Sequence, residues 1–442
     1  MRIDKIIVDN FKLFEHEEFE FHDSFNLIVG INGSGKTALL RAVAVAMAGW
    51  AHAFIKNPQN LRPISDSEIR EIQLDKRFDR TGSVSISATG KAAIIDRFGN
   101  KKTGHVEWKR NRDNEPNGPT HVSGTIRHDS NRREYNLNFH ILGNDILQFI
   151  ENDGKFELPI LAFYECDRLW LPNDKISAEK SATTKFSRFD PYKDCFHTGI
   201  DHSAIGEWLL KHELASVQQG TETTALKIMR QAAIAALEDC TGLRFDFEEG
   251  RVIVEFAENK AIPFEHLSDG QRTMLALFCD IARRAILLNP HLETNAARAA
   301  AGIVLIDELD LHLHPRWQRR VVHDLRRAFP NIQFICTTHS PQIIGEVPPE
   351  QIIVLKDGER MQTPQSYGMD SNWILDTLME ADSRNPEVTN ELGEIFHLIE
   401  TEEYDHAETR ITDIRNKLGG DTPELVEAMT LIEHYRMMGD EQ

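Results

Sequence analysis

The chain has 442 residues, a formal net charge of −20 and an apolar content of 40%. This length can bury one large core or two to three smaller ones, and the apolar content is ordinary for a water-soluble protein. The negative charge argues against broad, unspecific attraction to nucleic acid, although a local basic strip is compatible with it.

Targeting signals and metal-binding cysteine patterns are both missing from the sequence. No apolar run approaches the roughly 18 residues that a membrane-spanning helix needs, and the first residues, MRIDKIIVDNF, lack the pattern of a signal peptide. We therefore expect a cytoplasmic protein with no membrane partner. Free, mostly buried thiols are expected for the five scattered cysteines, which are Cys166, Cys195, Cys240, Cys279 and Cys336.

The first fifty residues predict three strands and a helix. Residues 2–9 alternate as a half-buried strand does, and the alternating run at 18–22 and the apolar run at 25–30 add two more strands. We expect these three strands to form one small sheet that ends in a glycine-rich turn. A helix from Lys36 to about Met47 is expected to follow that turn.

The middle of the chain predicts a sheet and then helices. Short alternating runs separated by turn residues at 82–139 indicate an antiparallel sheet. We next expect a buried strand leading into a loop at 159–171 and an irregular segment at 172–200. Helices at 203–240 without sustained heptads and a hairpin at 243–258 are expected to follow. For the basic stretch 101–114, which contains Trp108, a solvated hairpin is favoured over a nucleic-acid contact.

The last part of the chain predicts helix, strand, helix and strand up to Ser340, the order of a parallel sheet. Beyond about Tyr367 the chain is expected to be helical. We therefore expect four regions: an N-terminal lobe with the glycine-rich turn at 1–50, an insertion at 51–260, a second lobe at 261–365 and a helical C-terminal region at 366–442.

The glycine-rich turn lies within IVGINGSGKTALL, residues 28–40, and fits the phosphate-loop pattern G-x-x-x-x-G-K-T. Its glycines let backbone N–H groups face phosphate oxygens, while Lys36 reaches the β- and γ-phosphates and the Thr37 hydroxyl ligates magnesium. The following helix directs the positive end of its dipole at the same anion. The expected nucleotide-binding residues are Asn32, Gly33, Ser34, Gly35, Lys36, Thr37 and Ala38.

The segment GIVLIDELDLHLHP, residues 302–315, carries two carboxylates directly after an apolar strand. The carboxyl ends of such strands are where doubly wound sheets bind ligands. Asp307 is placed to hold magnesium. Glu308 points to the other side and can accept a proton from an attacking water.

Two further motifs are each open to a structural interpretation. In HLSDGQR, residues 266–272, Ser268 and Gln271 fit a capping box, so the stretch predicts a helix start and, equally, an anion site. In NIQFICTTHSP, residues 331–341, a strand ends at His339. A histidine there can stabilise a γ-phosphate, although a lone histidine is more often structural.

Together the four motifs resemble the ATP-binding-cassette (ABC) ATPase superfamily in the order phosphate loop, signature, Walker B and switch histidine. The opening residues 3–21 and the DELDLHLHP form of Walker B are similar to SMC/RecF-type ATPases. The C-terminal region is similar to Septu anti-phage ATPases and to the bacterial family named "ATP-binding protein involved in virulence". The resemblance implies an α/β fold: an ABC-type ATPase head with a central, mostly parallel sheet, an N-terminal antiparallel β part, a helical insertion and a helical C-terminal tail. It also implies ATP and Mg²⁺ as cofactors.

The resemblance also implies roles for individual residues. Glu308 would be the general base, His339 the switch histidine and Asp310 the D-loop aspartate, while Asp307 and Thr37 would hold the metal. Lys12 would lie near the phosphates. The signature that reaches the γ-phosphate on a partner subunit would be Ser268, Asp269, Gly270 and Gln271.

One departure from the family concerns the signature, where L-S-G-G-Q reads L-S-D-G-Q in this chain. Asp269 would repel a γ-phosphate, and so slow hydrolysis, unless it points away or pairs with a cation such as Arg272. The position of the Q-loop glutamine is not fixed by the sequence.

The resemblance implies an ATP-hydrolysing switch in a bacterial anti-phage defence complex. Two protomers, or a higher homo-oligomer, would join head to tail around ATP and regulate an HNH-type nuclease partner. Two alternatives remain, namely a RecF-like repair ATPase that binds nucleic acid and an ATP-joined scaffold that does not hydrolyse. A Toprim nuclease is disfavoured, because the residues after His339 lack a strand-borne Glu and Asp-x-Asp set.

Overall fold

The computed structural model describes residues 1–55, 61–75, 77–96, 99–127, 134–136, 138–166, 187–196, 202–363 and 365–440. These residues form two compact units, Met1–Asp370 and Ser371–Gln442, which we call the head and the C-terminal unit. Most of the irregular segment expected at 172–200 lies outside the described residues. The domain limits expected within the head stay predictions.

The head is organised around a six-stranded sheet in the order β10-β14-β15-β3-β16-β17. Five strands run parallel and the edge strand β17 is antiparallel. Almost every residue of the parallel strands is buried, as expected for a sheet covered on both faces. The expected α/β fold with a central, mostly parallel sheet is confirmed. The strands are β10 (Ile160–Tyr164), β14 (Gly302–Ile306), β15 (Ile332–Thr337), β3 (Phe25–Val29), β16 (Ile352–Lys356) and β17 (Glu359–Met361).

A second six-stranded sheet has the order β2-β1-β6-β7-β8-β9 and is antiparallel throughout. The prediction that residues 2–30 form one small sheet is wrong, because β1 and β2 join this sheet whereas β3 joins the parallel one. The burial patterns explain the difference: β1 has both buried and partly exposed positions, but all five side chains of β3 are buried. The strands are β2 (Phe14–Glu20), β1 (Arg2–Phe11), β6 (Val84–Ile95), β7 (Lys101–Arg112), β8 (His121–Arg127) and β9 (Glu134–Asn136).

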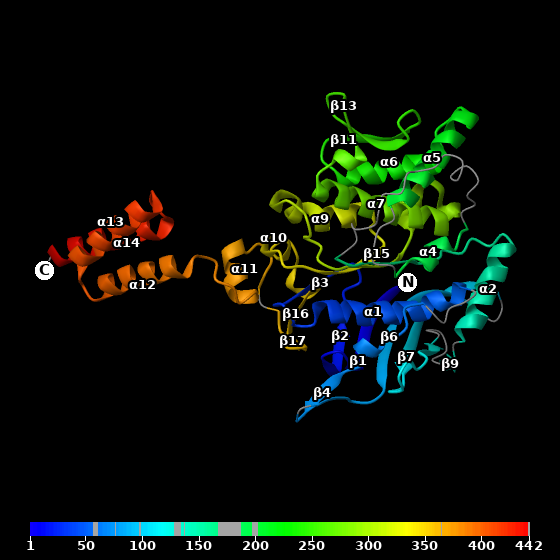
Figure 1. Cartoon of the computed structure of the whole chain (residues 1–442), viewed down its shortest axis with the longest axis horizontal. Helices are drawn as coiled ribbons and strands as arrows, with labels where there is room; N and C mark the ends of the chain where they lie inside the picture. The colour runs from blue at the N-terminus through cyan, green and yellow to red at the C-terminus, as the bar shows by residue number, and fades with distance from the viewer. Residues whose placement is uncertain are drawn as a thin grey trace. The chain divides into compact units, whose positions relative to one another are not determined.

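Helix α1 (Lys36–Ala51) runs between the two large sheets (Figure 1). All of its residues except Thr37 and Arg41 are buried. Contrary to the expectation that no apolar run approaches membrane-spanning length, the segment Lys36–Phe54 is long and apolar enough to cross a membrane by composition alone, but 89% of it is buried inside the head. This helix starts at the phosphate loop, so its burial fixes the loop relative to both sheets.

Strand β7 packs its polar side chains against α1. Trp108 donates its indole N–H to the Ala46 carbonyl over 2.8 Å, and Arg110 donates to the Val45 carbonyl over 3.1 Å. Trp108, Arg110 and Arg112 are all almost completely buried. The solvated hairpin expected at 101–114 is therefore wrong for this face of the strand, because the alternating positions face the core helix.

The opposite face of the parallel sheet is covered by α7 (Asp269–Leu288) and α9 (Pro315–Ala328), with further helices and a small sheet packed on them (Figure 1). The hairpin expected at 243–258 is confirmed as β11 and β12, to which β13 adds a third strand. The additional elements on this side are α5 (His202–Gln219), α6 (Thr224–Ala236), β11 (Cys240–Asp246), β12 (Arg251–Phe256), β13 (Lys260–Pro263) and α8 (Ala296–Ala299).

The head also contains a two-stranded sheet and short helices, while the C-terminal unit is entirely helical, as expected. Further helices and strands among the described residues of the head are β4 (Glu71–Leu74), β5 (Arg77–Arg80), α2 (Phe139–Glu151), α4 (Asp190–Lys193) and α10 (Pro341–Ile344). The C-terminal unit has α11 (Ser371–Leu378), α12 (Pro386–Glu400), α13 (Tyr404–Leu418) and α14 (Pro423–Asp440). Its last three helices share one apolar core that includes Ile395, Ile411 and Leu425.

A buried ion network ties α7 to the edge of the parallel sheet. Asp280 on α7 accepts hydrogen bonds from Arg283 and Arg284, each over 2.7 Å, and from the hydroxyl of Tyr164, the last residue of β10, over 2.8 Å. Burial would raise the pKa of Asp280, but the charges and hydrogen bonds of Arg284 and Arg283 hold that pKa well below its usual range. The network therefore depends on a charged Asp280.

Replacing Asp280 with asparagine should lower the free energy of unfolding of the head by about 3 kcal/mol, because two buried guanidinium groups lose their buried counter-charge and keep only the partly exposed Asp194 as a partner. Chemical denaturation followed by tryptophan fluorescence measures this change. The control is Glu238→Gln at an exposed pair with Arg316, which should change the value by less than about 1 kcal/mol. Equal stability of Asp280→Asn and the wild type would contradict the assigned role of the network.

Candidate functional site

The phosphate loop connects the carboxyl end of β3 to α1, and its shape requires glycine at two positions. A Cβ on Gly30 would lie 2.3 Å from the Leu355 carbonyl oxygen and 2.5 Å from the Ser34 hydroxyl oxygen. Gly35, the N-cap of α1, has a φ of 107°, in the left-handed region that favours glycine. The buried Ser34 hydroxyl has no hydrogen-bond partner among the described residues. A cradle with an unsatisfied polar atom fits the phosphate ligand that the motif implies.

Lys36 is held across this loop. Its ammonium group donates to the carbonyl oxygens of Gly30 and Ile31, each over 2.8 Å. Burial lowers the pKa of Lys36, and the nearby carboxylates of Asp307, Glu308 and Asp310 act in the opposite direction. The ammonium therefore lies in the loop and within the electrostatic field of the Walker B segment.

Asp307 joins the ends of the strands at the carboxyl edge of the sheet. The Thr37 hydroxyl donates to Asp307 Oδ2 over 3.0 Å, and the Thr337 hydroxyl donates to Asp307 Oδ1 over 2.6 Å. The backbone N–H of Asp307 donates to the Tyr164 carbonyl over 2.8 Å. Carboxylate and hydroxyl oxygens are ligands that Mg²⁺ prefers, so Thr37 and Asp307 fit the metal that the phosphate loop implies.

Glu308 follows in a constrained backbone conformation. Its φ is 51°, in the left-handed region that non-glycine residues rarely adopt. Its backbone N–H donates to the Thr337 hydroxyl over 2.7 Å, and the N–H of Leu309 donates to the Thr337 carbonyl over 2.8 Å. Backbone strain of this kind is concentrated at functional sites. The two hydrogen bonds to Thr337 hold the Glu308 backbone in this conformation.

The structure also brings the expected D-loop aspartate to the expected switch histidine. Asp310 Oδ1 accepts hydrogen bonds from the Thr338 hydroxyl over 2.5 Å and from the backbone N–H of His339 over 3.1 Å. His339 is partly exposed at the tip of β15. Next to it, the Ser340 hydroxyl lies 2.8 Å from Gln318 Oε1 on α9.

The signature residues lie at the start of α7. Ser268 is the N-cap, and its hydroxyl accepts from the Gln271 N–H over 3.4 Å in a capping box. Among the described residues, the hydrogen bonds of Ser268 stay within this turn, and Ser268 is exposed to solvent. A Cβ on Gly270 would lie 2.5 Å from the His312 carbonyl oxygen, so this helix start packs on the segment that follows Asp310.

Asp269, the departure from the family signature, is paired with a cation. Arg272, one helical turn later, donates to its carboxylate. This hydrogen bond and the charge of Arg272 hold the pKa of Asp269 below its usual range. The carboxylate thus keeps its charge, but the neighbouring guanidinium compensates it.

The turn between β1 and β2 lies against the phosphate loop, which is where the resemblance puts Lys12. A Cβ on Gly35 would lie 3.2 Å from a Leu13 methyl carbon. Lys12 has a φ of 52°, and its N–H donates to the Glu68 carbonyl over 2.8 Å. The other expected loop residues divide by burial: Asn32 and Gly33 are exposed, whereas Ala38 is buried.

Sequence reasoning missed several residues of this edge. Thr337 positions Asp307 and Glu308, and Thr338 contacts Asp310. Glu165 follows β10 at the same edge and accepts from Arg41 of α1 over 3.3 Å. The consecutive threonines before His339 are a signal that could have indicated the first two residues, because hydroxyl groups at a strand end often bind polar neighbours.

Sequence comparisons find a matching family model and several related proteins. The family model described as "AAA domain, putative AbiEii toxin, Type IV TA system" matches residues 25–345. The chain is 37% identical over 230 residues to "Retron Ec83 probable ATPase" of Escherichia coli, which covers 51% of this chain and 42% of the relative. It is 28% identical over 370 residues to "Septu protein PtuA" of Bacillus mycoides, covering 81% of this chain and 41% of the relative.

The chain thus spans less than half the length of these two curated relatives. Among solved structures, the SMC head bound to the C-winged helix domain of ScpA aligns at 15% identity and a TM-score of 0.46. That alignment covers 81% of this chain and 96% of the SMC chain.

Replacing Thr337 with valine should weaken the Mg²⁺-dependent part of ATP binding about tenfold, because one buried hydroxyl holds both Asp307 and the backbone of Glu308. Titration of a fluorescent ATP analogue with and without Mg²⁺ measures this effect. Binding without Mg²⁺ should change little, and Thr337→Ser should restore the wild-type value. Equal loss with and without the metal would contradict a metal-positioning role.

Proposed function

Because the chain belongs to this AAA-domain family, whose model matches residues 25–345, we propose that it is the ATP-hydrolysing switch subunit of a bacterial anti-phage defence complex in the cytoplasm. Two protomers close head to tail around ATP and regulate a partner nuclease of the HNH type. The names of its relatives, a Septu protein and a retron ATPase, support the defence role.

The observation that carries the ATPase proposal is the contact between Thr37 and Asp307, which joins the phosphate loop to the Walker B strand across 270 residues. Thr37 and Asp307 would hold Mg²⁺, which when bound would neutralise negative charge on the nucleotide phosphates. Lys36 exchanges its two loop carbonyls for phosphate oxygens. Glu308, next to Asp307, accepts the proton of the attacking water.

Dimerisation is proposed because the site in one chain is incomplete. Ser268 is exposed, and among the described residues its hydroxyl donates only to Gln271 Oε1 of its own turn, so the O–H can turn to donate to a phosphate held by another chain. A γ-phosphate held by the loop of one protomer would be closed by Ser268 and Gly270 of the partner. Arg272 offsets the negative charge of Asp269, which favours hydrolysis over a purely structural use of ATP.

Replacing Glu308 with glutamine should reduce ATP turnover at least about 100-fold, because the general base is lost while the metal ligands stay. Phosphate release measures turnover, and size-exclusion chromatography with light scattering measures the ATP-bound dimer, which should accumulate. Turnover at the wild-type rate would show that Glu308 is not the base. A wild-type protein without any phosphate release would favour the scaffold alternative.

Shared sites can be tested by mixing two inactive variants, Lys36→Ala and Ser268→Arg. A mixed dimer contains one site in which both the loop and the signature are intact, so an equal mixture should recover about a quarter of the wild-type turnover. Neither variant alone should turn over ATP. The matched control mixes Lys36→Ala with Glu308→Gln. Both residues belong to the part of a site that the phosphate-loop protomer contributes, so each site of a mixed dimer still carries one of the two changes and no site is restored.

No recovery in the first mixture, with mixed dimers verified by native mass spectrometry, would contradict the head-to-tail arrangement. The partner is tested separately, by co-expression with an HNH nuclease and measurement of DNA cleavage with and without ATP.

A further inference from the structure

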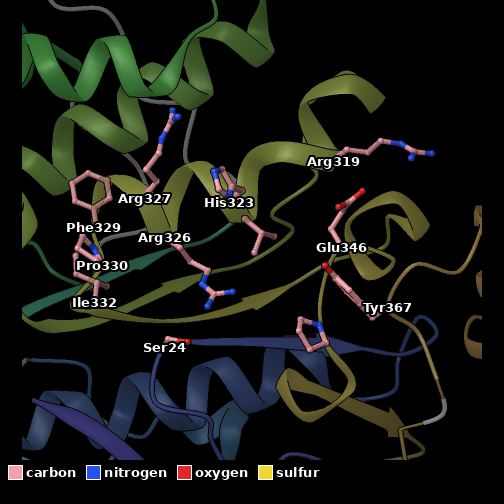
Figure 2. Close-up of a pocket in the computed structure, with 12 residues that line it drawn as sticks. Ser24, Arg319, His323, Arg326, Arg327, Phe329, Pro330, Ile332, Glu346 and Tyr367 are labelled. Carbon is pink, nitrogen blue, oxygen red and sulfur yellow. The ribbon is translucent and has the colours of Figure 1, made fainter.

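A groove of about 560 Å³ lies at the amino end of the parallel sheet (Figure 2). Ser24, just before β3, and Ile332, the first residue of β15, belong to its lining. The phosphate loop follows the other end of β3. A five-residue strand spans about 16 Å, so the groove is distinct from the nucleotide site.

One wall of the groove is formed by basic side chains of α9. Arg319, His323, Arg326 and Arg327 line it. Helical spacing places these residues along one side of α9, while the side chains of Arg319 and Arg327 point away from that of Arg326 in Figure 2. Figure 2 shows Arg326 pointing from α9 toward Ser24. All four of these residues are exposed.

The arginines of α9 differ in their partners. Arg316 and Arg320, outside the groove, pair with Glu238 over 2.8 and 3.6 Å, and Arg327 lies 3.4 Å from Asp324. Arg319 and Arg326 have no acidic partner within the part of the chain that the structure describes. In a chain with a net charge of −20, two uncompensated guanidinium groups in one groove create a local site for an anion.

The opposite wall carries an aromatic ring. Tyr367 is 59% exposed and lies beside Glu346 in Figure 2. Glu346 is the one acidic residue in the described lining. Its negative charge repels an anion from this wall, so an anion in the groove is expected along α9. An exposed aromatic ring opposite guanidinium groups is the combination that binds single strands, with stacking for a base and positive charge for phosphates.

We propose that this groove binds single-stranded nucleic acid, with Arg319 and Arg326 contacting phosphates and Tyr367 stacking on a base. A peptide with carboxylates is less well suited. The lining side chains of Val322, Phe329 and Ile332 are only 4%, 1% and 2% exposed, so these three offer a peptide little apolar contact. A duplex is less well suited because its bases are already stacked.

The test measures binding of fluorescent single-stranded DNA and RNA, about 16 nucleotides long and of mixed sequence, to the full chain by anisotropy at several salt concentrations. The double variant Arg319→Ala/Arg326→Ala should bind about tenfold more weakly, with a salt slope smaller by about 1.4. Its ATP turnover should match that of the wild type. The matched control, Arg316→Ala/Arg360→Ala, removes the same charge outside the groove and should bind as the wild type does.

The stacking contact has its own pair of variants. Tyr367→Phe should retain wild-type affinity, whereas Tyr367→Ala should lose about tenfold. Three results would overturn the proposal: no strand binding by the wild type at low salt, equal loss in the two double variants, or binding of a polyglutamate peptide but not of the strands. Because these readouts do not depend on hydrolysis, they stay informative if the chain proves not to be an ATPase.

Discussion

The hydrogen bonds of the Asp307 carboxylate are the constraint on which the site depends. One oxygen accepts from Thr37, at the start of α1, and the other from Thr337, at the end of β15. Both bonds form only if β3, β14 and β15 end at the same level, which the parallel register of these strands ensures. Two other features stabilise that alignment. The burial of α1 between two sheets fixes the helix that follows β3, and the Asp280 network on α7 fixes the end of β10, which is the neighbour of β14.

Local chemistry made part of this site predictable from the sequence. The phosphate loop, the Asp-Glu pair after an apolar strand and the capping box at Ser268 each depend on residues within a few positions of one another. The pairing of Asp269 with Arg272 was foreseeable for the same reason, since residues three apart on a helix are neighbours. The class of fold followed from the alternation of strands and helices in the last third of the head.

Long-range pairing was not predictable in the same way. The sequence does not say that β1 pairs with β6 while β3 inserts between β15 and β16, because alternation indicates a strand without naming its neighbour. Trp108 and Arg110 look like surface residues of a basic hairpin until α1 is placed against them. The paired threonines before His339 mark Thr337 only as a polar residue at a strand end, and its role depends on a carboxylate 30 residues away.

The central place of β3 also sets an order of events during synthesis on the ribosome. This early strand has β15 and β16 as its two neighbours, and Asn26 donates to the carbonyl of Phe334, 308 residues later. At the usual rate of translation, roughly 15 to 60 s pass between the synthesis of β3 and that of β15. During this time both hydrogen-bonding edges of β3 lack their native partner strands. Since Thr37 cannot meet Asp307 before then, the nascent chain has no complete nucleotide site that could help its early folding. Protection of this apolar strand must come from α1 and the first antiparallel strands, or from chaperones.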